Sequence, residues 1–109
     1  MSRRWIGAVM IGAMVLATLA FWGALPARIP THWNFRGEVD GWAPRWPGAF
    51  LVPAIALALW LLLPFLRRVD PRRENYERFD DTFYILLNVI VAYMAVIHVL
   101  TLGSAVGWP

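Results

Sequence analysis

Hydrophobic and polar residues are segregated into long blocks along this chain. Three stretches contain no Asp, Glu, Lys or Arg, namely Trp5–Ala27, Trp46–Leu66 and Thr82–Pro109. Each is at least as long as the roughly 20 apolar residues that cross the hydrocarbon core of a bilayer as a helix. The pattern therefore predicts an all-α integral membrane fold with three transmembrane helices, at about residues 5–25, 46–66 and 82–104.

The third helix is expected to begin before its membrane span. Asp70 and Pro71 suit an N-cap followed by the first helical position, and neither Pro nor Gly recurs until Gly103. Arg73 and Glu77 are one of two opposite-charge pairs at i,i+4 spacing, which support a helix in water. We therefore expect this helix to extend into the cytoplasm from about residue 71.

Composition agrees with a membrane protein. The chain has 109 residues, of which 60% are hydrophobic and 16% charged, whereas roughly a quarter are charged in a typical soluble domain. We read residues 1–109 as a single three-helix membrane domain with two connectors, an aromatic outer loop at 26–45 and a charged cytoplasmic connector at 67–81. Little chain is left for a catalytic domain, and with no Cys there is neither a disulfide nor a thiolate site.

The arginines predict the orientation of the chain. All ten basic residues are Arg, and seven of them fall on the N-terminal side of the membrane if the three spans alternate. The positive-inside rule then places the N-terminus in the cytoplasm and the C-terminus in the periplasm of a multi-pass protein. The anchors of this topology are Arg3, Arg4, Arg67, Arg68, Arg72 and Arg73. No basic stripe lies apart from the membrane segments, so we expect no nucleic-acid partner.

The N-terminus has some features of an export signal, since Ser2, Arg3 and Arg4 precede an apolar run. That run continues to Leu25, which is longer than the hydrophobic region of a usual cleaved leader. We therefore expect it to be retained as the first transmembrane helix.

The outer loop is the most distinctive stretch of the sequence. Trp33, Phe35, Trp42 and Trp46 are suited to the headgroup layer of a membrane. We expect a compact hairpin or an irregular loop on the outer surface, with tight turns at the two glycines, Gly37 and Gly41.

The motif Pro30-Thr31-His32-Trp33-Asn34, with Gly37 and Asp40-Gly41-Trp42 after it, resembles a bacterial membrane-domain family of unknown function. That family includes the Sdp-type immunity proteins, which protect producers of a secreted peptide toxin. Residues 69–76 also resemble the family's cytoplasmic connector. The resemblance implies a module of the bacterial inner (cytoplasmic) membrane whose outer loop binds an extracellular peptide or a membrane-protein partner. The loop residues that we single out for such contacts are His32, Trp33, Asn34, Asp40 and Trp42.

Loop chemistry favours turn capping over metal binding or catalysis. His32, Glu38 and Asp40 are too few for a metal site, which needs three or four convergent ligands with second-shell support. We expect Asn34, Glu38 and Asp40 to cap turns and meet the loop's own arginines, and His32 to bond to loop backbone. With no nucleophile beside a base and no paired carboxylates in a span, the chain is expected not to be an enzyme.

Asn88 and His98 are the notable polar residues inside the predicted spans. Such residues are functional suspects by default, and their simplest role is an interhelical hydrogen bond. For His98 a weaker alternative is an axial ligand to a haem or chlorin, although no cofactor is predicted. The two residues lie about 15 Å apart along one helix, so no small site holds both.

Two functions remain open at this point. The first is a non-enzymatic membrane module that acts through helix and loop contacts, like the immunity proteins. The second is an accessory or stabilising subunit of a larger membrane complex, respiratory, photosynthetic or transport. Small residues of the first helix, such as Ala8 and Gly12, allow close helix approach either within the chain or to a partner.

Overall fold

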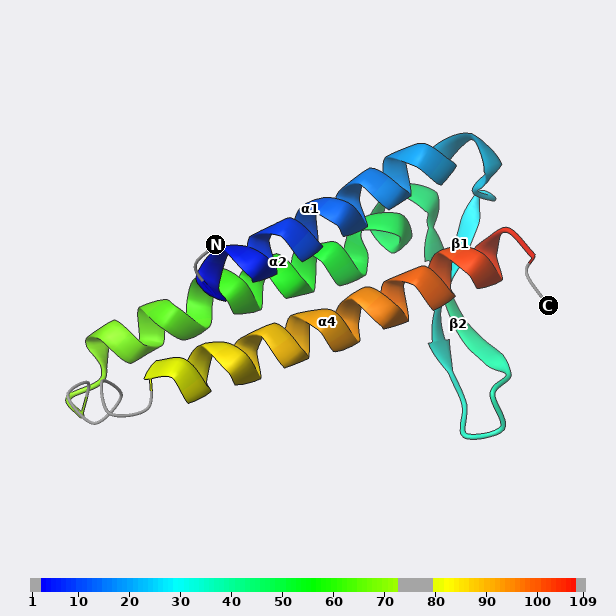
Figure 1. Ribbon diagram of the computed structural model, residues 1–109. Helices are drawn as coiled ribbons and strands as arrows, with labels where there is room; N and C mark the ends of the chain where they lie inside the picture. Colours follow the sequence, from blue (N-terminus) through cyan, green and yellow to red (C-terminus); the bar gives the residue numbers. More distant parts are fainter. Residues whose placement is uncertain (1–2, 73–79, 108–109) are drawn as a thin grey trace.

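Three long helices lie side by side in the computed structural model, with a β-hairpin across one end (Figure 1). The structure describes residues 3–72 and 80–107. The helices are α1 (Arg3–Phe21), α2 (Arg45–Val69) and α4 (Asp80–Ala105), and a 3-10 turn, η1 (Trp22–Ala24), follows α1. All three are long and apolar enough to cross a membrane. The prediction of three such helices is therefore confirmed.

The outer loop forms a compact hairpin, one of the two expected forms, so the prediction of an all-α fold is wrong for this part of the chain. Strands β1 (Arg28–Trp33) and β2 (Val39–Pro44) pair antiparallel within it. Gly37 adopts a φ of 79°, a left-handed conformation that glycine enters at no steric cost. The expected turn at Gly37 is thus confirmed, whereas Gly41 lies within β2 and marks no turn.

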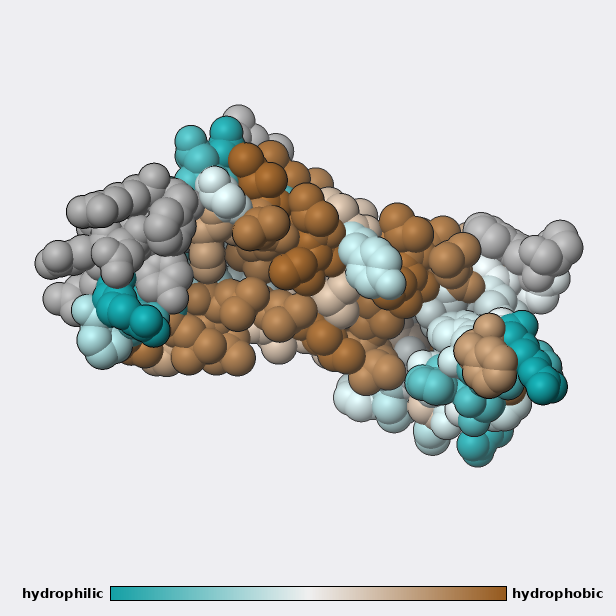
Figure 2. All heavy atoms as spheres, turned by 90° about the horizontal axis from the view of Figure 1, so that it is seen from below, coloured by the Kyte–Doolittle hydropathy of each residue, from teal (hydrophilic) through white to brown (hydrophobic). Residues whose placement is uncertain are grey.

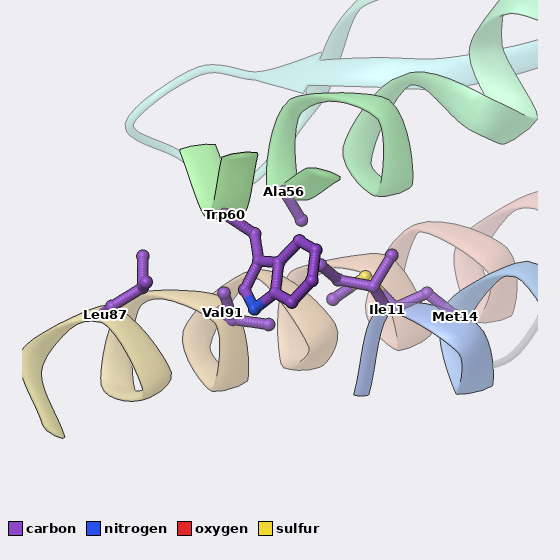
Figure 3. Close-up of a cluster of buried hydrophobic side chains, with 6 residues drawn as sticks. All are labelled: Ile11, Met14, Ala56, Trp60, Leu87 and Val91. Carbon is purple, nitrogen blue, oxygen red and sulfur yellow. The ribbon is translucent and has the colours of Figure 1, made fainter. Parts of the chain in front are cut away.

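The middle of the bundle is packed around Trp60 of α2. Figure 3 shows its indole ring among Ile11, Met14 and Val91, which come from the two neighbouring helices. A Cβ on Gly7 would lie 2.9 Å from Trp60 Cδ1. The absence of a side chain at this position therefore lets α1 approach the tryptophan closely.

A second core cluster joins the hairpin to the bundle. Ile29 of β1 is fully buried and packs with Leu25, Ala49 and Leu102. A Cβ on Gly48 would lie only 2.7 Å from the Ile29 Cβ. Twenty residues cannot build a core of their own, and the base of the hairpin solves this by entering the core of the helices.

The surface is divided into an apolar belt and two polar ends. Figure 2 shows hydrophobic residues along the middle of the molecule and hydrophilic ones gathered at both extremities. Large apolar side chains such as Leu16, Leu61 and Leu100 are more than half exposed on the helices, as expected for side chains that face lipid. The ends are called here the hairpin end and the arginine end, the latter carrying Arg3, Arg4, Arg67 and Arg68.

The connector after α2 differs in part from the expected helix. Pro71 and Arg72 lie in a turn, and the Asp70 carboxylate accepts a 2.8 Å hydrogen bond from the Arg72 backbone N–H. The remaining part of the predicted extension, residues 73–79 with Arg73 and its pairing to Glu77, lies outside the described residues. The side of the membrane on which this end lies stays a prediction.

Candidate functional site

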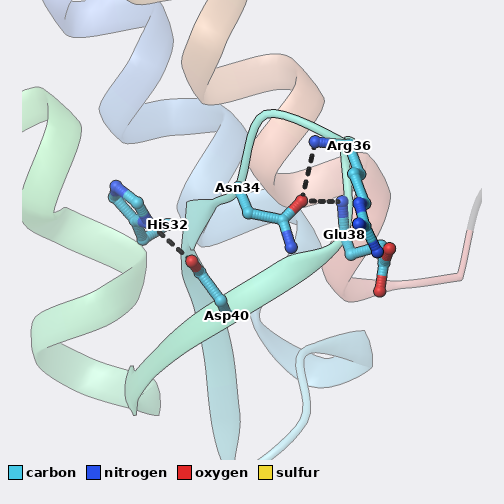
Figure 4. A network of polar contacts seen from close by, with 5 residues as sticks. All are labelled: His32, Asn34, Arg36, Glu38 and Asp40. Carbon is cyan, nitrogen blue, oxygen red and sulfur yellow. Dashed lines mark hydrogen bonds and ion pairs between the residues drawn. The ribbon is translucent and has the colours of Figure 1, made fainter.

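The tip of the hairpin is organised by Asn34. Its side-chain oxygen accepts hydrogen bonds from the backbone N–H groups of Arg36 (2.9 Å) and Glu38 (3.0 Å). Its backbone carbonyl accepts another from Gly37 N–H at 3.0 Å, and its own N–H donates to Glu38 O at 2.9 Å. Figure 4 shows the side-chain part of this network. The predicted capping role of Asn34 is confirmed, and the amide serves the turn itself.

A second contact, between His32 and Asp40, crosses the hairpin. The Nδ1 of His32 lies 2.5 Å from Asp40 Oδ1 and donates to it. His32 pairs with Gly41, and the strand register is irregular on both sides of it. A Cβ on Gly41 would come within 3.1 Å of the His32 Cβ. The bulged register and the missing side chain therefore leave room for the two polar groups to meet.

The expected partners of these residues are wrong in two respects. Asp40 contacts His32 and makes no ion pair with a loop arginine within the described chain. His32 bonds to this carboxylate instead of to loop backbone. Glu38 contributes only its backbone to the bonds that order the turn, and in Figure 4 its side chain lies beside Arg36, away from the histidine. The bulge, which no local pattern signals, decides these partners.

The hairpin carries two exposed aromatic rings. Phe35 at the tip is 95% exposed and Trp42 is 51% exposed. Trp33, another interaction candidate, is partly buried. Phe35 is predicted from the sequence to lie in the headgroup layer but not to contact a peptide or protein partner, although its place in the turn between Asn34 and Gly37 is a signal that could have identified it.

Arg45, the first residue of α2, ties the base of the hairpin to the segment that follows α1. Its backbone N–H donates to Ala27 O at 2.8 Å, and its side-chain Nε donates to Pro26 O at 3.1 Å. The guanidinium also lies 5.9 Å from the centre of the Trp22 ring. These contacts hold the base of the hairpin in place, while its tip projects away from them.

A buried polar junction joins all three helices below the hairpin. His98 of α4 places its Nε2 2.8 Å from Thr18 Oγ1 and 3.2 Å from the Met14 carbonyl, both on α1. A carbonyl can only accept, so the ring proton is on Nε2, which donates. The Thr18 hydroxyl has one proton, and two carbonyls can accept it, that of Ala49 on α2 at 3.1 Å and that of Met14 on its own helix at 3.2 Å. Both side chains are buried.

Pro53 of α2 explains why a hydroxyl donor, that of Thr18, is needed beside the Ala49 carbonyl. A helical carbonyl accepts from the N–H four residues later, and proline has no N–H. The Ala49 carbonyl faces Pro53 in this way, so it lacks its helical donor inside the membrane-spanning segment. Thr18 supplies a replacement, in the manner by which Ser and Thr side chains satisfy backbone freed by proline in membrane helices. α2 thereby continues unbroken through Pro53.

Asn88 makes a separate interhelical contact. Its Nδ2 donates to the Arg3 carbonyl at 2.9 Å, near the start of α1. The structure thus bears out interhelical hydrogen bonding for both Asn88 and His98, and it does not bring the two together. His98 Nε2 is engaged by Thr18, so a role of His98 as an axial ligand would have to use Nδ1. That role stays a prediction.

Within residues 3–72 and 80–107, no three His, Cys, Asp or Glu side chains gather into a set that could hold a metal ion. The pair of His32 and Asp40 therefore stands without a third such ligand there.

The topology anchors Arg3, Arg4, Arg67 and Arg68 share one end of the bundle, and Arg72 follows α2.

Comparisons with known proteins match part of the chain. A family model described as a domain of unknown function (DUF1648) matches residues 9–57, which run from α1 through the hairpin into α2. Matrix metalloproteinase-23 of Rattus norvegicus is 36% identical over 86 residues, covering 76% of this chain and 21% of that protein. The chain thus spans about a fifth of the length of this relative. No solved structure matches. The match over residues 9–57 is consistent with an uncharacterised family of membrane domains.

Proposed function

We propose that this chain is a non-enzymatic module of the bacterial inner membrane that acts through its hairpin, in the manner of the Sdp-type immunity proteins. The single observation that carries the proposal is the hairpin's two-part construction. Its base is buried in the bundle at Ile29, whereas Phe35 at its tip is 95% exposed. A held base with an exposed aromatic tip is suited to meeting an extracellular peptide or another membrane protein.

The polar and aromatic groups at the tip supply complementary contacts. Aromatic rings are enriched at binding interfaces because they bring a large contact area with few rotatable bonds. The His32 side chain is exposed and held by Asp40, so its Nε2 is available to a partner. Trp42 on the neighbouring strand is half exposed.

Photo-crosslinking in cells tests this proposal. A photoreactive phenylalanine analogue at Phe35 is compared with the same analogue at Phe65, which is 57% exposed on α2. We expect a peptide or protein adduct at position 35 that is missing at position 65 and falls several-fold with Trp42→Ser. Adducts to lipid alone at both positions would leave the hairpin as a headgroup anchor and contradict the proposal.

The immunity function has its own test. Deletion of the chain is expected to sensitise cells to the medium of toxin-producing cells, and His32→Ala is expected to reproduce that sensitivity. Glu38→Ala is a matched control, because Glu38 is also exposed on the hairpin and contributes only its backbone to the Asn34 network. Unchanged sensitivity after deletion would remove the immunity function.

A second candidate, an accessory subunit of a larger membrane complex, is favoured by the outer face of α1. Gly12 and Ala13 are exposed, and a Cβ on Gly12 would meet nothing within 4 Å. Small residues allow another helix to approach closely. Gly12→Leu is then expected to release the chain from a complex on a native gel, whereas Ala54→Leu, on an exposed face of α2, is expected to leave it bound. Migration of the wild type alone would contradict this candidate.

A further inference from the structure

The arginine end of the bundle contains a hollow that follows from unequal helix positions. α1 begins alongside Trp60, whose indole N–H donates to the Arg4 carbonyl at 2.9 Å. α2 continues nine residues further to Val69, and α4 begins at Asp80. Figure 1 shows α2 and α4 running on beyond the start of α1. A cavity of about 490 Å³ lies here, lined by Arg4, Leu61, Phe65, Arg67, Arg68 and Asp80, among others.

The described residues that line this cavity carry more positive than negative charge. Arg67 forms an ion pair with Asp80 and lies 5.0 Å from the centre of the Phe83 ring, so its side chain is fixed and mostly buried. Arg68 makes no ion pair with any residue that the structure describes. Among the lining residues that the structure describes, one carboxylate, that of Asp80, accompanies three guanidinium groups.

Arg4 carries an unused donor at the same place. Its guanidinium lies 5.3 Å from the centre of the Trp60 ring, which orients it. Its Nε is buried, with no hydrogen-bond partner among the described residues. A buried donor without a partner carries a free-energy cost, and Arg4 is one of the residues that line the cavity.

The chemistry of the lining indicates the class of ligand. Guanidinium groups bind phosphate oxygens with paired hydrogen bonds. Leu61 and Phe65 are 53% and 57% exposed on the neighbouring surface of α2, within a segment long and apolar enough to span a membrane. A ligand that suits both the guanidinium groups and these apolar side chains has a phosphate group joined to hydrocarbon chains. Basic pockets between membrane helices bind anionic lipid headgroups for this reason.

We propose that this cavity binds the phosphodiester headgroup of an anionic phospholipid. Arg4 and Arg68 contact the phosphate, Arg67 stays paired with Asp80, and the acyl chains lie along Leu61 and Phe65. The site is independent of any partner at the hairpin, because it lies at the opposite end of the bundle (Figure 1).

Native mass spectrometry of the full chain in mild detergent tests the site. Phosphatidylglycerol and phosphatidylcholine are added in equal amounts, and we expect the anionic lipid to be retained about tenfold more, as suits charge-assisted hydrogen bonds. Arg68→Gln is expected to lower phosphatidylglycerol binding roughly tenfold. Arg72→Gln, which removes the same charge at the same end from a side chain 80% exposed and outside the cavity lining, is expected to change it less than about twofold.

Three results would overturn the proposal. Equal losses for Arg68→Gln and Arg72→Gln would mean diffuse attraction to the charge of this end. Equal retention of phosphatidylglycerol and phosphatidylcholine would mean that the cavity does not select an anionic lipid. Displacement of the lipid by millimolar glycerol phosphate would identify a site for soluble phosphates. Circular dichroism of each variant verifies that the helices are intact.

Discussion

The molecule contains two small polar networks that use the same kinds of groups in opposite ways. In the hairpin, His32 meets Asp40 and Asn34 caps the turn, between residues at most eight positions apart. In the bundle, His98 meets Thr18 across 80 positions. The first network is exposed and orders a loop, whereas the second is buried and joins three helices.

The two networks differ in whether water can satisfy their polar groups when a hydrogen bond breaks. Water can satisfy the hairpin groups when a bond breaks, so each bond there contributes little to stability. In the membrane-spanning part no water is at hand, and a freed carbonyl or imidazole N–H stays unsatisfied. We therefore expect the polar groups of the bundle junction to contribute more to stability than the polar groups of the hairpin.

The largest effect is expected at the joint between the two regions. Gly48→Val places a Cβ within about 2.7 Å of the Ile29 Cβ, and overpacking of a core costs about 1–3 kcal/mol or more. We expect a loss of about 3 kcal/mol in the free energy of unfolding, measured in mixed micelles by tryptophan fluorescence. Gly12→Val is the control, because a Cβ there meets nothing within 4 Å. Equal losses would contradict the seating of the hairpin in the bundle core.

An intermediate effect is expected at the junction itself. Thr18→Val keeps the shape of the side chain and removes the hydroxyl that serves both His98 and the Ala49 carbonyl. Interhelical hydrogen bonds in membranes contribute about 0.6–1.7 kcal/mol, so we expect a loss of about 1–2 kcal/mol in the same unfolding assay. Thr82→Val, at an exposed position of α4, is expected to change stability by less than about 0.5 kcal/mol. No difference between the two variants would remove the contrast between the networks.

The smallest effect is expected in the hairpin. A double-mutant cycle of His32→Ala and Asp40→Ala measures their coupling free energy, which we expect to be below about 1 kcal/mol because the pair is exposed. The bundle helices should stay intact in all three variants by circular dichroism. A coupling above about 2 kcal/mol would show that the hairpin pair is as structural as the bundle junction.

Several parts of the fold and site could be predicted from the sequence. The three apolar helices follow from uncharged runs longer than a bilayer is thick, and the turn follows from Asn34 and Gly37, whose roles depend on residues at most four positions away. The contact of His32 with Asp40 could not be predicted, since it depends on an irregular register. The cavity at the arginine end depends on where α1 begins relative to Trp60, which no local pattern encodes.

The sequence by itself therefore determined the number of membrane-spanning segments and the chemistry of the hairpin turn, because both depend on run length and near neighbours. Tertiary structure decided which polar groups meet inside the bundle. Pro53 is visible in the sequence as the loss of a donor, but only helix packing brings Thr18 to the Ala49 carbonyl and His98 to Thr18. Where water cannot satisfy a polar group, its partner is set by the helix that lies opposite.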